Sequence, residues 1–407
     1  MYSSGFARIG LATAAVVVAA AAVLPAEKTG SAIPSHPDDK TIVHVLNRLG
    51  FGPVPGDIER VRRVGLDHYI DQQLHPERIA DTAMTERLSG FESLTKSTRE
   101  LADSYFIPAM QERTRAKREA ATQPPDAVAD KRSMRTPGQV DAMQAERRVL
   151  GELTQQKVLR AAYSERQLDE VMVDFWFNHF NVFAGKGQVR LYLTEYERDT
   201  IRPHVLGTFR ELLGATAESP AMLFYLDNWQ SSAPEGSPTA APDRRAQNPM
   251  RMRARQLARA PQLPAPMPGV VPPAPQKRRP RGVNENYARE LMELHTLGVD
   301  GGYTQKDVQE VARAFTGWTI ANPRQGGEFR FEPRMHDDGE KMVLGHRIAA
   351  GGGQHDAEQV LDILAAHPST ARFIATKLAR RFVADVPPAA LVDRAAARFR
   401  ATGGDIR

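Results

Sequence analysis

The sequence contains no cysteine, which excludes disulfide bonds, thiolate metal ligands and cysteine nucleophiles. Beyond the N-terminal region it lacks any apolar stretch long enough to cross a membrane. It has no Gly-x-Ser-x-Gly elbow, no His-Glu-x-x-His motif, and no histidine with a glutamate three residues before it. A serine hydrolase elbow, a zincin site and a bundle di-iron site therefore have no sequence signature here, and packing alone must hold the fold.

The composition is that of a globular protein with a large core. The chain has 407 residues, of which 41% are hydrophobic and 25% are charged, a balance typical of folded domains. Helical periodicity dominates, and strand patterns are rare. We therefore predict a mainly α-helical protein, built as a single large domain of many helices with one small β-hairpin.

The N-terminal region has the pattern of an export signal. Arg8 precedes a continuous apolar run from Ile9 to Leu24, and small residues at 30–32 offer a cleavage point. We predict a signal peptide over residues 1–32, no membrane span after its removal, and a periplasmic or secreted protein. A retained signal anchor is the alternative.

A segment rich in proline and arginine divides the rest of the chain. Residues 231–282 hold twelve of the 29 prolines, and their ten basic against two acidic residues give a net charge of +8 in a chain of +5. This composition predicts a disordered insertion between a first helical part, 41–230, and a second, 283–407. The insertion is either a solvated loop or a tether to anionic envelope surfaces. Export argues against nucleic acid as the partner.

Local helix signals are clear in the first part. The apolar spacing predicts a helix that ends at Gly50, a second helix from about Pro55 to Val64, and a third from Leu66 to Leu74.

Capping signals define helix starts in the second part. Thr304 and Asp307 have the spacing of a capping box. We also expect Asp356 to cap the helix that runs to Ala366, and Pro368 to open the next helix.

The predicted hairpin lies at about residues 328–348. Phe329 and Phe331 alternate with polar residues, Asp338-Gly339 is a favoured hairpin turn, and residues 342–344 can return as the partner strand.

The segment from Leu168 to Phe183 has the pattern of a buried helix with one polar stripe. Apolar and aromatic side chains cover most of its circumference. Asp174, Asn178 and Asn181 stand at i, i+4 and i+7, so they share one face. If that face is buried, each polar group needs a partner.

The segment "NENYARELMELHTLG" at 284–298 offers a second polar stripe. The residues in line are Glu285, Arg289, Glu293 and Thr296, flanked by Asn286 and Glu290. Spacing alone favours ordinary i,i+4 ion pairs on a wet surface. The sharper hypothesis is that the two stripes face each other across a shared pocket.

The residue types also allow a divalent cation. The oxygen ligands available to a hard ion are Asp174, Asn178, Asn181, Glu285 and Asn286. A zinc ion would need His179, His295 and His336 to converge. The first two histidines are expected to be core residues, whereas His336 stands in a loop-like stretch from which a side chain can reach a site.

Several long stretches resemble one bacterial family. They are "LNRLGFGPVPGDI", "MVDFWFNHFNVF", "NENYARELMELHTLG" and "YTQKDVQEVARAFTGW", with "HDDGEKMVLG" and "HPSTARFIATKLARRFV" beyond them. In this order they resemble the family catalogued as domain of unknown function 1800, over about Thr41 to Arg407. The resemblance implies an exported, mostly helical, uncharacterised protein. It also implies a partner from an exported family that resembles sulfatases, and further helices after "ATGGDIR", so that the chain is truncated.

Two functions remain open at this point. The first is an enzyme, or the partner of an enzyme, that acts on an envelope or extracellular polymer. Its catalytic candidates are Asp174, Glu285, Arg289, Glu290 and His336, with Arg289 orienting an anion. The second is a non-catalytic secreted scaffold or binding protein. An enzyme needs the acids and His336 around one accessible cavity, whereas a scaffold leaves them dry or scattered.

Overall fold

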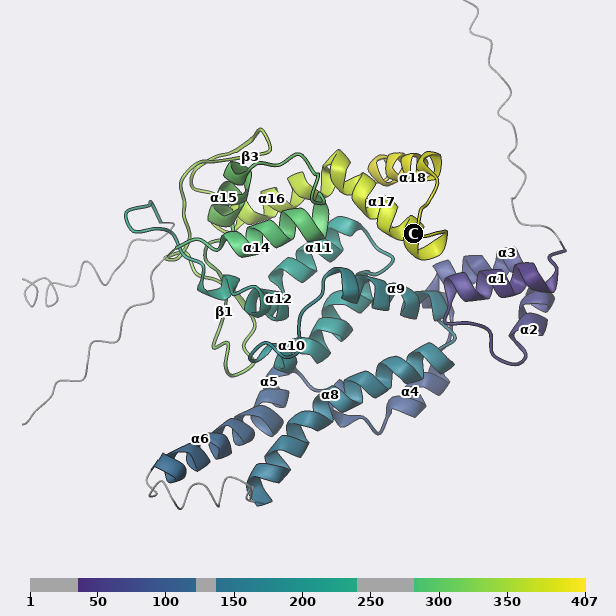
Figure 1. The fold of residues 1–407 in the computed structure, drawn as a ribbon, viewed down its shortest axis with the longest axis horizontal. Helices are drawn as coiled ribbons and strands as arrows, with labels where there is room; N and C mark the ends of the chain where they lie inside the picture. Colours follow the sequence, from purple (N-terminus) through teal and green to yellow (C-terminus); the bar gives the residue numbers. More distant parts are fainter. Residues whose placement is uncertain (1–35, 122–136, 240–281) are drawn as a thin grey trace, which may run out of the picture.

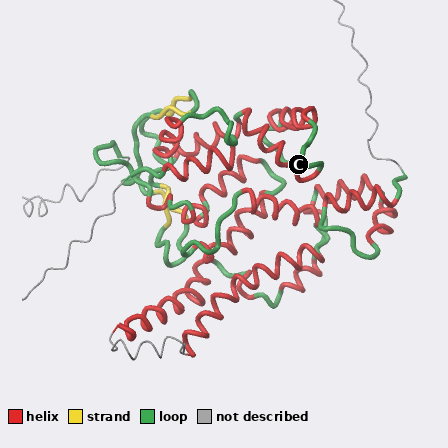
Figure 2. The backbone as a smooth tube through the Cα atoms, in the orientation of Figure 1, coloured by secondary structure: helices red, strands yellow, loops and turns green. Residues whose placement is uncertain are grey.

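The computed structural model describes residues 36–121, 137–239 and 282–407, and these residues are mainly helical (Figures 1 and 2). The predicted signal peptide and residues 240–281 of the predicted insertion lie outside the described residues. Within the described part of the chain, no helix is both long enough and apolar enough to span a membrane.

The first part of the chain forms helices and short helical turns. The α-helices are α1 (Asp39–Leu49), α2 (Asp57–Val64), α3 (Leu66–Leu74), α4 (Thr82–Leu88), α5 (Thr98–Leu101), α6 (Ile107–Ala121), α8 (Pro137–Tyr163), α9 (Gln167–His179), α10 (Val189–Glu195), α11 (Phe209–Glu218) and α12 (Pro220–Tyr225). Between them lie the 3-10 turns η1 (Pro76–Arg78), η2 (Glu92–Leu94), η5 (Arg202–His204) and η6 (Asn228–Gln230), and the π-helical turns η3 (Ala102–Phe106) and η4 (Tyr196–Ile201).

The second part adds helices and four short strands. The helices are α14 (Glu285–Glu290), the π-helical turn η7 (Leu291–Thr296), α15 (Gln305–Ala314), α16 (His355–Ala366), α17 (Pro368–Phe382) and α18 (Ala389–Ala401). The strands are β1 (Trp318–Ile320), β2 (Phe329–Phe331), β3 (Lys341–Val343) and β4 (His346–Ile348).

The local helix signals of the first part are confirmed. α1 ends at Leu49 with Gly50 as its C-cap, and α3 begins and ends at the predicted residues. The start of α2 is set by Gly56, whose φ of 95° is a left-handed conformation that favours glycine. These helices close over a small apolar core of their own.

The main core surrounds α9, which lies at the centre of the molecule (Figure 1). Trp176 of this helix is fully buried, packs against Phe180 and Phe209, and donates a hydrogen bond from Nε1 to the Val205 carbonyl at 3.1 Å. His179, at the end of the helix, bonds to the main chain of η7. The two parts of the chain therefore share one core.

The strand content is as small as expected, but the predicted pairing is wrong. Two antiparallel pairs form, β1 with β2 and β3 with β4, and no hairpin joins β2 to β3. Residues 337–338 pair instead with a segment from the first part of the chain. Thr239 forms a bridge with Asp337, and the Asp338 amide donates to the Pro238 carbonyl.

Two of the three capping predictions for the second part are confirmed. Thr304 and Asp307 form a capping box on α15, and Pro368 opens α17. The third is wrong, because α16 has Gln354 as its N-cap and Asp356 lies inside its first turn, fully buried.

Candidate functional site

The first polar stripe lies on the surface. The Asp174 side chain is 49% exposed, lies 3.8 Å from the Lys157 ammonium, and receives a hydrogen bond from Asn178. Asn178 is exposed, and so is Asn181, which lies beyond the end of α9. The stripe is not interior as predicted, because α9 turns its aromatic face, including Trp176, toward the core.

The second stripe also has partners of its own. Gln305 of α15 donates to Glu285 at 2.6 Å and accepts from Arg289 at 2.6 Å. Asn286 is exposed, while Glu290 is half-buried, and burial followed by the nearby Glu293 raises the Glu290 pKa. These side chains lie over α14 and α15, whereas Asp174 lies over α8 and α9, so the two stripes do not form one interior seam.

The end of the second stripe is displaced by a π-helical turn. Tyr287 and Leu291 are buried as the helical pattern requires, but Leu294 is 46% exposed and His295 is buried in its place. In η7 each turn is wider than in an α-helix, which moves the inward face by about one residue.

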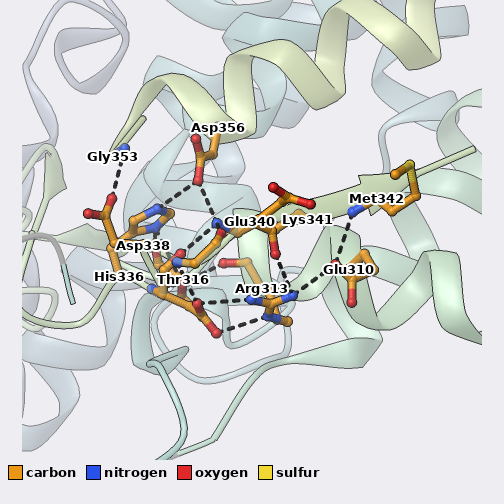
Figure 3. A network of polar contacts seen from close by, with 12 residues as sticks. Glu310, Arg313, Thr316, His336, Asp338, Glu340, Lys341, Met342, Gly353 and Asp356 are labelled. Carbon is orange, nitrogen blue, oxygen red and sulfur yellow. Dashed lines mark hydrogen bonds and ion pairs between the residues drawn. The ribbon is translucent and has the colours of Figure 1, made fainter. Parts of the chain in front are cut away.

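His336 lies in a closed network rather than in an accessible loop (Figure 3). Its ring is fully buried, with Nδ1 2.8 Å from the Thr316 carbonyl and Nε2 3.2 Å from Asp356 Oδ2. The Lys341 ammonium donates to the same Asp356 oxygen at 2.5 Å and to the carbonyls of Asp337 and Gly339.

This network holds the strands to α15 and α16. Arg313 of α15 donates one hydrogen bond to each oxygen of the Asp337 carboxylate, at 2.9 and 3.1 Å. Lys341 and Asp356 have no exposed side-chain surface, so a substrate has no access to them. The expectation that His336 reaches a site from a loop is therefore wrong, and the network's geometry is that of a structural clamp.

His179 and His295 are core residues, as their sequence positions favoured. Lys377 of α17 donates to His179 Nδ1 at 2.9 Å, and His179 Nε2 donates to the His295 carbonyl at 3.0 Å. Burial, and then the Lys377 charge, lowers the pKa of both rings, to about 3 for His295. Within the described ranges, no three His, Cys, Asp or Glu side chains are placed to hold a metal ion.

A cavity of about 770 Å³ lies elsewhere, where α4, α9 and η5 meet. We call it the arginine cavity. The charged residues that line it are Glu77, Asp81, Arg160, Arg166, Asp169, Glu170, Arg198, Arg202 and Arg407. None of the catalytic candidates predicted from the sequence lines this cavity.

A buried ion network forms one wall of the arginine cavity. Arg202 binds Glu170 at two points, 2.8 and 3.0 Å, and donates to Glu197 at 3.0 Å. Arg160 of α8 adds a bond to Glu170 at 3.2 Å. Burial works to lower the Arg202 pKa, but the Glu170, Glu197 and Asp169 carboxylates raise it, so the guanidinium stays charged.

Asp169 is an acid of this wall whose pKa is shifted toward neutral. Its side chain is 13% exposed, and its contact with Arg202 is long, at 3.4 Å. Burial raises the Asp169 pKa to about 6 against the opposing charge of Arg202, with Glu170 adding to the rise. A carboxyl with such a pKa can donate or accept a proton near neutral pH, which suits general acid–base chemistry.

A smaller pocket shares Glu170 with the arginine cavity. We call it the α8–α9 pocket; its volume is about 200 Å³. The residues that line it are Phe51, Lys157, Val158, Ala161, Glu170, Val173, Asp174 and Glu197. Of the predicted site residues, Asp174 therefore does border a pocket, although without the predicted partners from α14.

Sequence reasoning missed the central residues of this site. Asp169 and Glu170 look like ordinary acids in the first turn of a helix. Glu197 and Arg202 are five residues apart, a spacing that brings two side chains together in a π-helical turn but not in an α-helix. The sequence signal available was the mixture of charged and large apolar residues in "LYLTEYERDTIRPHVL", residues 191–206.

The family model described as "Protein of unknown function (DUF1800)" matches residues 44–407. This match covers most of the chain, and the chain belongs to that family. No curated protein and no solved structure matches it.

Proposed function

We propose that this member of the DUF1800 family is an enzyme that binds an anionic ligand in the arginine cavity and exchanges a proton with it through Asp169. The observation that carries the proposal is the placement of Asp169, a carboxyl with a pKa of about 6, on the wall of a cavity of about 770 Å³. Perturbed acids in cavities are characteristic of catalytic sites.

The charge of the cavity favours an acidic ligand. The side chains of five arginines and four carboxylic acids line it, so these side chains have one positive charge in excess, and the excess increases when Asp169 takes up a proton. Within the described part of the chain, Arg160 Nε is buried without a hydrogen-bond partner, and an unpaired guanidinium nitrogen favours a ligand acceptor.

The predicted export signal supports an envelope or extracellular polymer as the source of this ligand. An acidic polysaccharide combines negative charge with glycosidic oxygens, which carry no proton of their own and which a carboxylic acid can protonate. A sulfatase-like partner remains a prediction from the family resemblance.

Binding and turnover of an acidic oligosaccharide test the proposal. We expect the purified chain to bind trigalacturonic acid more tightly than its methyl ester, and D169N to retain binding while losing any cleavage. R160Q should weaken binding, because it removes one guanidinium from the lining of the cavity. The wall itself should stay in place, because Arg202 continues to hold Glu170. The matched control is R347Q, at a well-exposed arginine of β4.

Equal affinity for the acid and its ester would contradict the proposal, as would equal effects of R160Q and R347Q. A scaffold role has one observation in its favour, since Arg202 already satisfies both oxygens of Glu170. In that case D169N and R160Q would change the stability of the protein and leave ligand binding unaltered.

A further inference from the structure

We propose that the α8–α9 pocket is a binding site for a primary ammonium group, such as the amine of an amino sugar, with Glu197 as its acceptor. The pocket lies where the loop after α1 meets α8, α9 and η4. This inference is independent of any proton transfer at Asp169.

The Glu197 carboxylate is only half satisfied. Its side chain is 1% exposed. Oε1 accepts from Arg202 and from Gln156, each at 3.0 Å. Oε2 is buried and has no hydrogen-bond partner among the residues that the structure describes. A buried carboxylate oxygen without a donor is costly, so a donor from a ligand in the pocket would be stabilised there.

The other two carboxylates of the pocket differ in availability. Glu170 is occupied by Arg202 and Arg160. Asp174 is half-exposed and lies near Lys157. As far as the described residues go, the pocket thus has one free acceptor at a buried position and a second carboxylate near solvent, an arrangement that attracts a cation rather than an anion.

Lys157 does not occupy the free acceptor. Its ammonium lies 3.8 Å from Asp174 Oδ1 and 4.1 Å from the centre of the Phe177 ring. A ligand ammonium would compete with Lys157 for Asp174 but not for Glu197.

The apolar lining favours an organic ammonium over an inorganic ion. Phe51 and Val158 are 48% and 63% exposed, and Val173 is buried, so a carbon skeleton and a positive charge can both contact this lining. Calcium and magnesium need six or more oxygen ligands, and the part of the chain that the structure describes brings no three His, Cys, Asp or Glu side chains together to hold a metal ion.

Ligand-observed NMR and calorimetry of the full chain at pH 7.5 test the site. The first comparison is of glucosamine, which carries an amine, with glucose and N-acetylglucosamine, which have no charged group. The second comparison is of n-butylammonium with 1-butanol. We expect each amine to bind at least about tenfold more tightly than its uncharged counterpart, as a charge-assisted hydrogen bond implies. Tighter binding of glucosamine than of butylammonium identifies an amino sugar, and the reverse order identifies a linear amine.

Two variants connect the binding to the pocket. In E197Q the amide oxygen can still face Arg202 while a donor replaces the free acceptor, so amine binding should fall about tenfold or more. F51A removes a partly exposed ring, keeps the buried ion pairs, and should also weaken binding. The control F183A removes an exposed ring that is 62% accessible and does not line the pocket.

The inference is overturned if amines and their uncharged counterparts bind equally, or if a folded E197Q protein binds glucosamine as the wild type does. Should E197Q fail to fold, equal glucosamine binding by F51A and F183A overturns it. D169N should leave amine binding unchanged, which separates this test from that of the arginine cavity.

Discussion

Arg202 holds Glu170 at two points, with Nη1 2.8 Å from Oε1 and Nη2 3.0 Å from Oε2. The pair is largely shielded from water, since the Glu170 side chain is 6% exposed. Glu170 lines both the arginine cavity and the α8–α9 pocket, so both proposed sites depend on the integrity of the pair.

Loss of Arg202 should destabilise the protein strongly. R202M leaves Glu170 and Glu197 without their main counter-charge, and a broken buried pair typically costs about 3–5 kcal/mol. Urea unfolding at pH 7.5 measures the loss. The control is R210M, whose partner Asp362 is well exposed and whose loss should cost less than about 1 kcal/mol. Similar losses for both variants would show that the wall contributes no special stability.

Asp169 should reduce stability above pH 6. Because its pKa is raised to about 6 from 3.8, the folded protein holds this proton more tightly than the unfolded chain. Stability from this group is present below pH 4 and is lost as the pH rises to 6, amounting to at most about 3 kcal/mol. D169N should therefore be more stable than the wild type at pH 7.5, with the difference vanishing toward pH 4.

Thermal unfolding of D169N and the wild type across pH 4 to 8 checks this expectation. A D169N protein that is less stable at pH 7.5 would mean that the ionised carboxylate stabilises the fold and that the raised pKa is wrong. A catalytic acid that costs stability is a common trade-off.

The buried pair of Lys341 and Asp356 should be essential to the second part of the chain. K341M leaves Asp356 charged with only His336 beside it. We expect the free energy of unfolding to fall by about 3–5 kcal/mol. The double variant K341M/D356L should recover part of that loss. R347M, at the exposed pair with Glu340, is the control and should cost under about 1 kcal/mol. A small effect of K341M in urea unfolding would contradict the clamp.

His295 should contribute to acid denaturation. Its folded pKa is lowered to about 3 from 6.5, so the unfolded chain binds the proton more readily. The stability from this group is complete above pH 6.5 and decreases as the pH falls toward 3. H295F keeps an aromatic ring without a titrating group. Its unfolding midpoint should fall less steeply than that of the wild type between pH 7 and pH 4, and parallel curves would contradict this.

Asp174 and Glu285 should have little effect on stability. Asp174 is paired with Lys157 across 3.8 Å near solvent, and Glu285 accepts from Gln305 on the surface. We expect D174A and E285A each to change the free energy of unfolding by less than about 1 kcal/mol. A loss of activity with intact stability would restore the predicted catalytic roles, and a large loss of stability would show a structural role for these side chains.

Part of the site could have been anticipated from the sequence. Asp174 was identified from its position on the aromatic helix, and it does border a pocket. Glu285 and Arg289 were identified from the same kind of pattern, and they bond to Gln305 instead. A helical wheel gives the face on which a side chain lies, but it does not give the element that packs there.

The sequence by itself determined the helical class, the ends of α1 and α3, the capping box at Thr304, the helix start at Pro368 and the family. These features depend on interactions within one or two helical turns, which neighbouring residues specify. Only the tertiary structure decided that β2 pairs with β1, that Asp356 meets Lys341, and that Asp169 and Glu197 line cavities. The partners of buried charges and strands are chosen by packing between distant segments, where burial and competition for hydrogen bonds outweigh local preference.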